Sequence, residues 1–249
     1  MADGAIESDN IVGYQDITIP AGFSMYTVTF KQIGANSFDI RNIVICNAEG
    51  TVMDDSTSAL RSRNKILVQK LDATTGSLYE DTYSFHSRNG WLVLGGEALT
   101  PNQVTLGNAE GLYINNGHDS AMKLRVSGEV VLTPISTSLP SGYSIVGNMT
   151  PATVDVKDIK ILNPDGVEYD DSTSALRSRN KVLVQKLDSA TGSLYETTYS
   201  FHSRNGWLVL GGDPLIANQV TLAPGESLYV NNGHDNAVYF KFPSPLAAE

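Results

Sequence analysis

The chain has 249 residues and a formal net charge of −10, with 17 Lys and Arg against 27 Asp and Glu. A duplex-binding protein normally carries the opposite sign, because phosphate neutralisation supplies most of its affinity. The longest apolar runs, such as WLVL, are too short to cross a bilayer as a helix. The sequence therefore predicts neither a nucleic-acid partner nor insertion into a membrane.

The start of the chain, residues 1–9, is expected to be an N-terminal tail. It lacks the basic and apolar regions of a signal peptide, which leaves open both a cytoplasmic location and an external one reached after removal of a signal. Further on, IVIC contains the single cysteine, Cys46, so no internal disulfide can form. We expect Cys46 to face the core as a small apolar residue, since a catalytic thiol needs a polar, electropositive setting.

From residue 10 onward the chain is a tandem repeat. A shift of 116 residues aligns 54–106 with 170–222 without a gap, and 45 of the 53 positions are identical. The preceding segments have drifted further and align at an offset of 120, as IPAGFS with LPSGYS shows. The sequence thus predicts two homologous β domains, repeat 1 at 10–129 and repeat 2 at 130–249.

Each repeat is predicted to be all-β, an antiparallel sandwich or a small barrel built from many short strands. In LYEDTYSFH, the aromatic residues Tyr79, Tyr83 and Phe85 alternate with polar residues that include Thr82 and Ser84. The run AMKLRV alternates in the same way, and its counterpart in repeat 2 keeps the register. The inward positions predicted there are Met122, Leu124, Val126, Val238, Phe240 and Phe242.

Turn motifs separate these runs. DATTGS, DSATGS, RNG, LPSG and NPDG each place glycine where a left-handed turn residue is expected. No window has a sustained helical period, so little helix is expected beyond a turn at SALRSRN.

The stretch DDSTSALRSRNK begins at Asp54 and again at Asp170 without a changed letter. Two explanations remain open: local gene conversion, or a surface that must meet the same kind of neighbour twice. The RSRNK cations could contact an acidic patch on that neighbour; the alternative is a solvated strand edge that discourages unwanted pairing. These interface candidates are Arg61, Arg63, Lys65, Arg177, Arg179 and Lys181.

The FHSRNGW segment supplies a second set of candidates. A tryptophan exposed beside arginine and asparagine would be a platform for a sugar ring, whereas a tryptophan in the core is the alternative. The candidates are His86, Arg88, Trp91, His202, Arg204 and Trp207. Near the end of each repeat, NNGHD is explained by a turn with Asx hydrogen bonds, and a ligand site is the alternative.

The sequence gives little support for an enzyme. It contains no nucleophile elbow, phosphate-binding loop or HExxH motif. His118 and Asp119 resemble half of a triad, but adjacent strand residues point to opposite faces. Calcium is the one cofactor considered, and its weak candidates are Asp54, Asp55, Asp170 and Asp171.

The segments NIVGYQDITIPAGFSM, LPSGYSIVGN and GESLYVNN resemble a family of uncharacterised secreted or surface β-proteins of bacteria with complex envelopes. Units of that family contain VGY…LPAGFSLI, GGW and LAPGEGFFVRN motifs. The resemblance implies a β fold and an extracellular or cell-surface location, and it carries over no catalytic residues. The duplicated basic stretch is longer and more basic than the corresponding family segment.

Together these observations predict a non-catalytic structural or surface protein. It would self-associate through its duplicated faces as a subunit of a lattice, ring or filament, so that its partner is another copy of itself. The alternative is a tandem carbohydrate-binding module for a repeating glycan, and a weaker one is a virion or phage structural protein.

Overall fold

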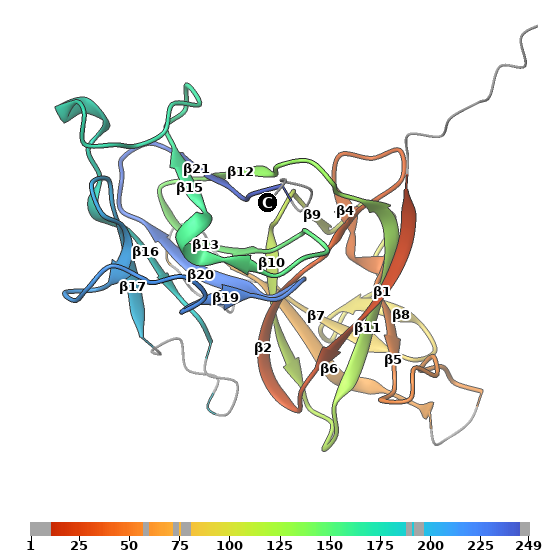
Figure 1. Cartoon of the computed structure of the whole chain (residues 1–249). Coiled ribbons are helices and arrows are strands. Elements are labelled where there is room, and N and C mark those ends of the chain that lie inside the picture. Colours follow the sequence, from red (N-terminus) through yellow and green to blue (C-terminus); the bar gives the residue numbers. More distant parts are fainter. Residues whose placement is uncertain are drawn as a thin grey trace, which may run out of the picture.

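The computed structural model describes residues 11–56, 60–71, 75, 81–187, 191 and 197–244. Within these residues the chain is all-β, as predicted: antiparallel strands form the sheets, and the helical elements are 3-10 helices of three residues (Figure 1). No helix in this part of the chain is both long and apolar enough to pass through a bilayer.

The first half contains eleven strands and one 3-10 helix among its described residues. Their bounds are β1 (Val12–Ile19), β2 (Gly22–Thr27), β3 (Phe30–Lys31), β4 (Phe38–Asp39), η1 (Ile40–Asn42), β5 (Val44–Cys46), β6 (Arg63–Lys70), β7 (Asp81–His86), β8 (Gly90–Val93), β9 (Thr105–Leu106), β10 (Gly111–Asn116) and β11 (Met122–Val130). β11 pairs with β1, β3 and β5 in one sheet, and a five-stranded sheet has the order β2-β10-β6-β7-β8. β4 pairs with β9.

The second half has ten strands and two 3-10 helices among its described residues. Their bounds are β12 (Ser136–Leu139), β13 (Gly142–Gly147), β14 (Val154–Asp155), η3 (Val156–Asp158), β15 (Lys160–Leu162), η4 (Ser174–Leu176), β16 (Arg179–Gln185), β17 (Thr198–His202), β18 (Gly206–Val209), β19 (Thr221–Leu222), β20 (Ser227–Asn232) and β21 (Val238–Lys241). The sheets are β12-β21-β15, β13-β20-β16-β17-β18 and β14-β19.

The two halves repeat one arrangement. The five-stranded sheets have corresponding strand orders, and in each half a hydrophobic core lies between that sheet and the sheet containing β11 or β21. β11 ends at Val130, next to the boundary that the repeat predicts. That each half is an independently folding domain stays a prediction.

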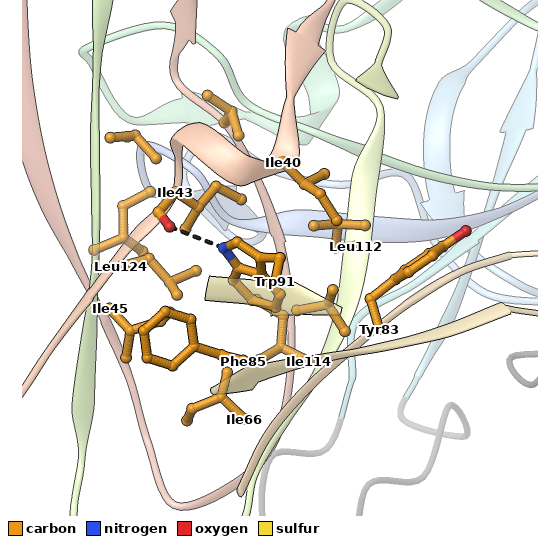
Figure 2. Packing of buried hydrophobic residues seen from close by; sticks show 14 of the residues in the cluster. Ile40, Ile43, Ile45, Ile66, Tyr83, Phe85, Trp91, Leu112, Ile114 and Leu124 are labelled. Atoms are coloured by element: carbon orange, nitrogen blue, oxygen red, sulfur yellow. Dashed lines mark hydrogen bonds between the residues drawn. The ribbon is translucent and has the colours of Figure 1, made fainter. Parts of the chain in front are cut away.

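A buried tryptophan lies at the centre of each core. The ring of Trp91 packs edge-on against Phe85 at 5.6 Å, and its Nε1 donates to the carbonyl oxygen of Ile43 at 3.0 Å (Figure 2). Trp207 donates in the same way to Ile159 at 2.9 Å. A buried indole N–H needs an acceptor, and in each half the residue that caps a 3-10 helix supplies it.

The predicted alternation is confirmed in β11 and around β21, where all six inward positions are buried. In β7, Tyr83 and Phe85 are buried as predicted. Ser84, predicted to lie on the opposite side, is also completely buried. Tyr79 lies outside the described residues.

The predicted turns are present where the structure describes them. The glycines of RNG, LPSG and NPDG all have positive φ; they are Gly90, Gly142, Gly166 and Gly206. The DATTGS and DSATGS turns lie outside the described residues except for one threonine in each. The helical turn predicted at SALRSRN is η4 in the second half. In the first half Ser58 and Ala59 lie outside the described residues.

The halves pack against each other through the outer faces of their five-stranded sheets. Tyr113 on β10 and Ile145 on β13 belong to one small buried cluster that also contains Met25 on β2. These residues point away from the two main cores. The outer faces of β2 and β10 in the first half and of β13 and β20 in the second therefore form the interface between the halves.

Two backbone hydrogen bonds across this interface form an equivalent pair. The N–H of Thr27 donates to Gly225 at 2.8 Å, and the N–H of Gly147 donates to Ala109 at 2.8 Å. The repeat alignment makes Thr27 equivalent to Gly147 and Ala109 equivalent to Gly225. One contact is thus made twice with the roles exchanged, so an approximate two-fold axis relates the halves.

The substitution Gly147→Ala tests this close approach. A Cβ atom at this position would overlap Oγ of Ser227 and Cγ2 of Thr27, so we expect a loss of about 1–3 kcal/mol in the free energy of unfolding. Urea denaturation measures the loss. Gly107→Ala is the matched control, because its Cβ would meet its nearest neighbour at 3.5 Å, and an equal loss in both variants would contradict the expectation.

Candidate interaction site

Two arginines of the first half contact one carboxylate. Arg61 Nε lies 3.1 Å from Asp55 Oδ1, and Arg88 Nε lies 2.9 Å from Asp55 Oδ2. Asp55 Oδ1 is buried and accepts no well-directed hydrogen bond, so charge rather than hydrogen bonding holds Arg61 there. The two arginine side chains are 47% and 69% exposed and can still contact a second molecule.

The second half builds the same cluster around Asp171. Nε of Arg177 lies 3.2 Å from Oδ1 of this carboxylate, and Nε of Arg204 lies 3.0 Å from Oδ2. Arg179 approaches Oδ1 at 3.8 Å. We call the two groups the basic clusters. They consist of Asp55, Arg61, Arg63, Lys65 and Arg88 in the first half and Asp171, Arg177, Arg179, Lys181 and Arg204 in the second.

A β-bulge lies in the strand that carries RSRNK in each half. β6 pairs with β7 at Arg63 and again at Leu67, and the register shifts between these two points. Asn64 lies in this irregular stretch with φ +54, and Asn180 in β16 has φ +53. Asparagine tolerates this left-handed conformation better than most residues. The unchanged asparagine in RSRNK therefore has a structural cause.

The serine in RSRNK is also structural. Ser62 is 1% exposed, and its Oγ lies 3.0 Å from Nε2 of His118. Ser178 and His234 form the same pair at 2.9 Å. Although the pairing resembles a nucleophile with its base, a buried hydroxyl is not presented to a substrate; the bond instead ties the NNGHD turn to the basic cluster.

The NNGHD turn is held by Asx hydrogen bonds, as predicted. Oδ1 of Asn116 accepts the N–H of His118 at 3.0 Å, while its Nδ2 donates to Pro20 and Ser120 at 3.0 Å. Asn232 repeats this pattern. The side chains in this motif are therefore engaged in the fold.

In the first half, the basic cluster borders a pocket of about 420 Å³. Arg61, Arg63, Lys65 and His118 line it together with Met53. Burial and the nearby positive charge of Lys65 lower the pKa of His118 below its ordinary value. The two arginines and the lysine make the pocket wall cationic, so it favours an anionic group, such as a carboxylate.

In the second half, Tyr169 stands at the position equivalent to Met53. Its ring centroid lies 5.0 Å from that of His234. The cations of the two basic clusters are identical, but this part of the wall has changed.

Of the two interpretations of FHSRNGW, the structure confirms the core tryptophan and not the sugar platform. Trp91 and Trp207 are 3% and 2% exposed and belong to the cores, so neither presents a ring to a ligand. Nδ1 of His86 accepts the N–H of Arg88 at 3.1 Å, and His202 does the same for Arg204. These histidines stabilise the hairpin turn that positions the exposed arginines.

The calcium candidates use their oxygens within the fold. Asp54 and Asp170 each accept hydrogen bonds from the serine two residues later, which lower the pKa of both carboxyl groups. Asp55 and Asp171 contact arginines instead. Among the described residues, no group of three His, Cys, Asp or Glu side chains is arranged to hold a metal.

Cys46 is completely buried, which confirms the expected core position. Burial raises the pKa of its thiol, so the reactive thiolate is disfavoured.

The sequence alone missed three features of the site: Asp55 as the centre of the cluster, the bond from Ser62 to His118, and the left-handed Asn64. All three occur at positions that are identical in both repeats. The identity of these positions could have marked them as candidates, but it does not show which residues contact one another in the fold.

Comparison of the chain with protein-family models, curated proteins and solved structures found no match. The resemblance to bacterial secreted or surface proteins therefore stays a prediction.

The left-handed conformation of Asn64 can be tested by substitution. Asn64→Gly should leave stability nearly unchanged, whereas Asn64→Ala should lower the free energy of unfolding by about 1 kcal/mol. Urea denaturation measures both variants. Equal stability of the alanine and glycine variants would contradict a left-handed residue here.

The lowered pKa values of His118 and His234 predict a pH-dependent stability. An unfolded histidine titrates at about pH 6.5, and burial keeps the folded pKa of each residue below that value. The unfolded state therefore takes up protons first as the pH falls, so stability is complete above about pH 6.5 and decreases through the lower folded pKa values.

Urea midpoints between pH 7.5 and 5.5 measure this loss. The double variant His118→Gln, His234→Gln should depend less on pH in this range. An unchanged dependence would assign the effect to other groups.

Proposed function

We propose that this protein is a non-catalytic structural protein that self-associates through its two basic clusters. The observation that carries the proposal is that the same pair of arginines contacts one carboxylate in both halves. The two other cations of each cluster follow on the same strand and are also identical between the repeats. Each cluster would contact an acidic part of a neighbouring copy.

The distribution of charge supports this choice of partner. A cluster with four cations and one carboxylate carries a formal charge of 4 − 1 = +3, so two clusters contribute +6 to a chain whose total is −10. The remainder of the chain therefore carries −16. The same molecule thus combines two basic clusters with a remainder of net negative charge, and opposite charges on different copies attract each other.

The charge also determines the kind of contact. Two basic clusters repel each other, so a symmetric contact between like clusters is disfavoured. Contact between a cluster and a different, acidic surface is heterologous, and heterologous contacts form rings or open chains depending on the rotation between copies.

The placement of the clusters fits a connecting subunit. In Figure 1 the orange segment that leads into β6 lies at the lower right, and the teal segment that leads into β16 lies at the upper left. The clusters flank β6 and β16 and therefore lie towards opposite ends of the molecule. A subunit with two distant equivalent sites can contact two neighbours at once, which increases avidity.

The setting that we propose is the bacterial surface or extracellular space, as the family resemblance implies. A virion or phage structural protein would use the same contacts. The burial of Trp91 and Trp207 removes the ring stacking on which the carbohydrate-binding alternative depended, so no specific contact favours that function.

Light scattering coupled to size-exclusion chromatography tests the proposal. The average mass should rise with protein concentration in about 20 mM salt and fall towards the monomer in about 500 mM salt, because salt screens exposed charges. Substitution of one cluster, by Arg63→Ser with Lys65→Ser, should lower the average mass. The further changes Arg179→Ser and Lys181→Ser should leave a monomer.

The matched control is Lys31→Ser with Lys241→Ser, which removes two exposed cations outside the clusters. It has the same net charge as the single-cluster variant and should assemble like the unmodified chain. A strict monomer at high concentration in low salt would overturn the proposal, as would equal weakening by the control.

A further inference from the structure

Two pockets lie between the halves, on either side of the approximate two-fold axis. The larger, of about 520 Å³, is lined by Leu71 and Glu110 from the first half and by Ser144 and Ile145 from the second. The smaller, of about 350 Å³, is lined by residues that include Leu187. We call them the large and the small interface pockets.

The repeat alignment shows that these are two versions of one pocket. Leu71, Glu110, Ser144 and Ile145 of the large pocket correspond to Leu187, Glu226, Ser24 and Met25 of the small one. A lysine in each half forms an ion pair with the glutamate: Lys70 with Glu110 and Lys186 with Glu226.

One residue explains why the pockets differ in extent. Tyr26 lines the small pocket, and its hydroxyl donates to the carbonyl oxygen of Thr18 at 3.0 Å. The tyrosine side chain thus spans from β2 to β1. Val146 occupies the equivalent position in the large pocket and is too short to reach Ser138, the counterpart of Thr18, so the large pocket extends along β12.

A second difference gives the large pocket an aromatic wall. Tyr239 lines it, and the equivalent residue of the first half is Lys123. Tyr143 adds another ring beside Leu71 and Ile145. Aliphatic and aromatic side chains therefore surround the space, and serine hydroxyls on β12 and β13 supply hydrogen-bonding groups.

We infer that the large interface pocket binds a neutral, amphipathic ring compound. Its volume is within the range of small-molecule sites, and an apolar wall with a few polar groups is their usual composition. The only charged residue in the described lining is Glu110, whose carboxylate is paired with Lys70, so the pocket offers no free charge to an ion. This site is separate from the basic clusters and does not depend on the proposed self-association.

The neutral fluorophore N-phenyl-1-naphthylamine is a suitable probe of the full chain. Its fluorescence should increase saturably, with one probe bound per chain. Val146→Tyr installs the residue that the first half already carries at this position, and it should weaken binding at least tenfold by filling the pocket. Tyr239→Lys, also a residue of the first half, should weaken binding by removing the aromatic wall.

Two control variants locate the probe. Tyr26→Val enlarges the small pocket and should not weaken binding. Ile33→Thr removes an exposed apolar side chain of the first half, where Ile33 is 63% exposed, and should bind like the unmodified chain. The near-ultraviolet circular dichroism of each variant confirms that it is folded.

Saturable binding that both Val146→Tyr and Tyr239→Lys weaken supports the inference. Two results would place the probe on the exposed surface and overturn the inference. One is fluorescence that does not saturate. The other is loss of binding in Ile33→Thr together with full binding in folded Val146→Tyr. If Val146→Tyr does not fold, Tyr239→Lys alone decides: unchanged binding by this folded variant would also overturn the inference.

Discussion

The packing of the two halves against each other is the contact on which the rest of the molecule depends. It places the backs of two five-stranded sheets together, and the backbone approaches closely at Gly111 and Gly147, where any side chain would meet atoms of the other half. Because the contact has approximate two-fold symmetry, the basic clusters and the interface pockets each occur twice in corresponding positions. The basic clusters lie away from the axis, and the interface pockets lie beside it. One interaction therefore determines both the separation of the clusters and the existence of the pockets.

The repeats are nearly identical in the block 54–106 and 170–222 but differ at the pockets between the halves. The pocket residues Tyr26 and Val146 differ between the halves, as do Lys123 and Tyr239, whereas all the cations of the basic clusters are unchanged. Part of the identity has an internal cause: Ser62 holds His118, and Asn64 forms the bulge. The fold does not require the exposed Arg63 and Lys65. Gene conversion and a common binding partner both remain explanations for these two residues.

The fold could be predicted from sequence where alternation and turns are strong. Apolar residues at every second position of β11 mark its inner face, and a glycine after asparagine marks the hairpin turn. Ser84 shows the limit, because alternation places it opposite Tyr83 and Phe85 but does not reveal that it is completely buried as well. Trp91 was ambiguous for a similar reason: the letters around it describe a turn, but the carbonyl of Ile43, 48 residues earlier, accepts its N–H. Likewise, Asp55 could not be recognised as the centre of a cluster, since its contact with Arg88 depends on the pairing of β6 with β7.

The burial of Cys46 has a practical consequence. It is the only cysteine in the chain, it lies in the first half, and its side chain is completely enclosed. A thiol reagent can modify it only when that half opens, so the rate of modification reports local opening of the first half alone. The two halves share most of their spectroscopic groups, so the thiol of Cys46 distinguishes the first half from the second without any added label.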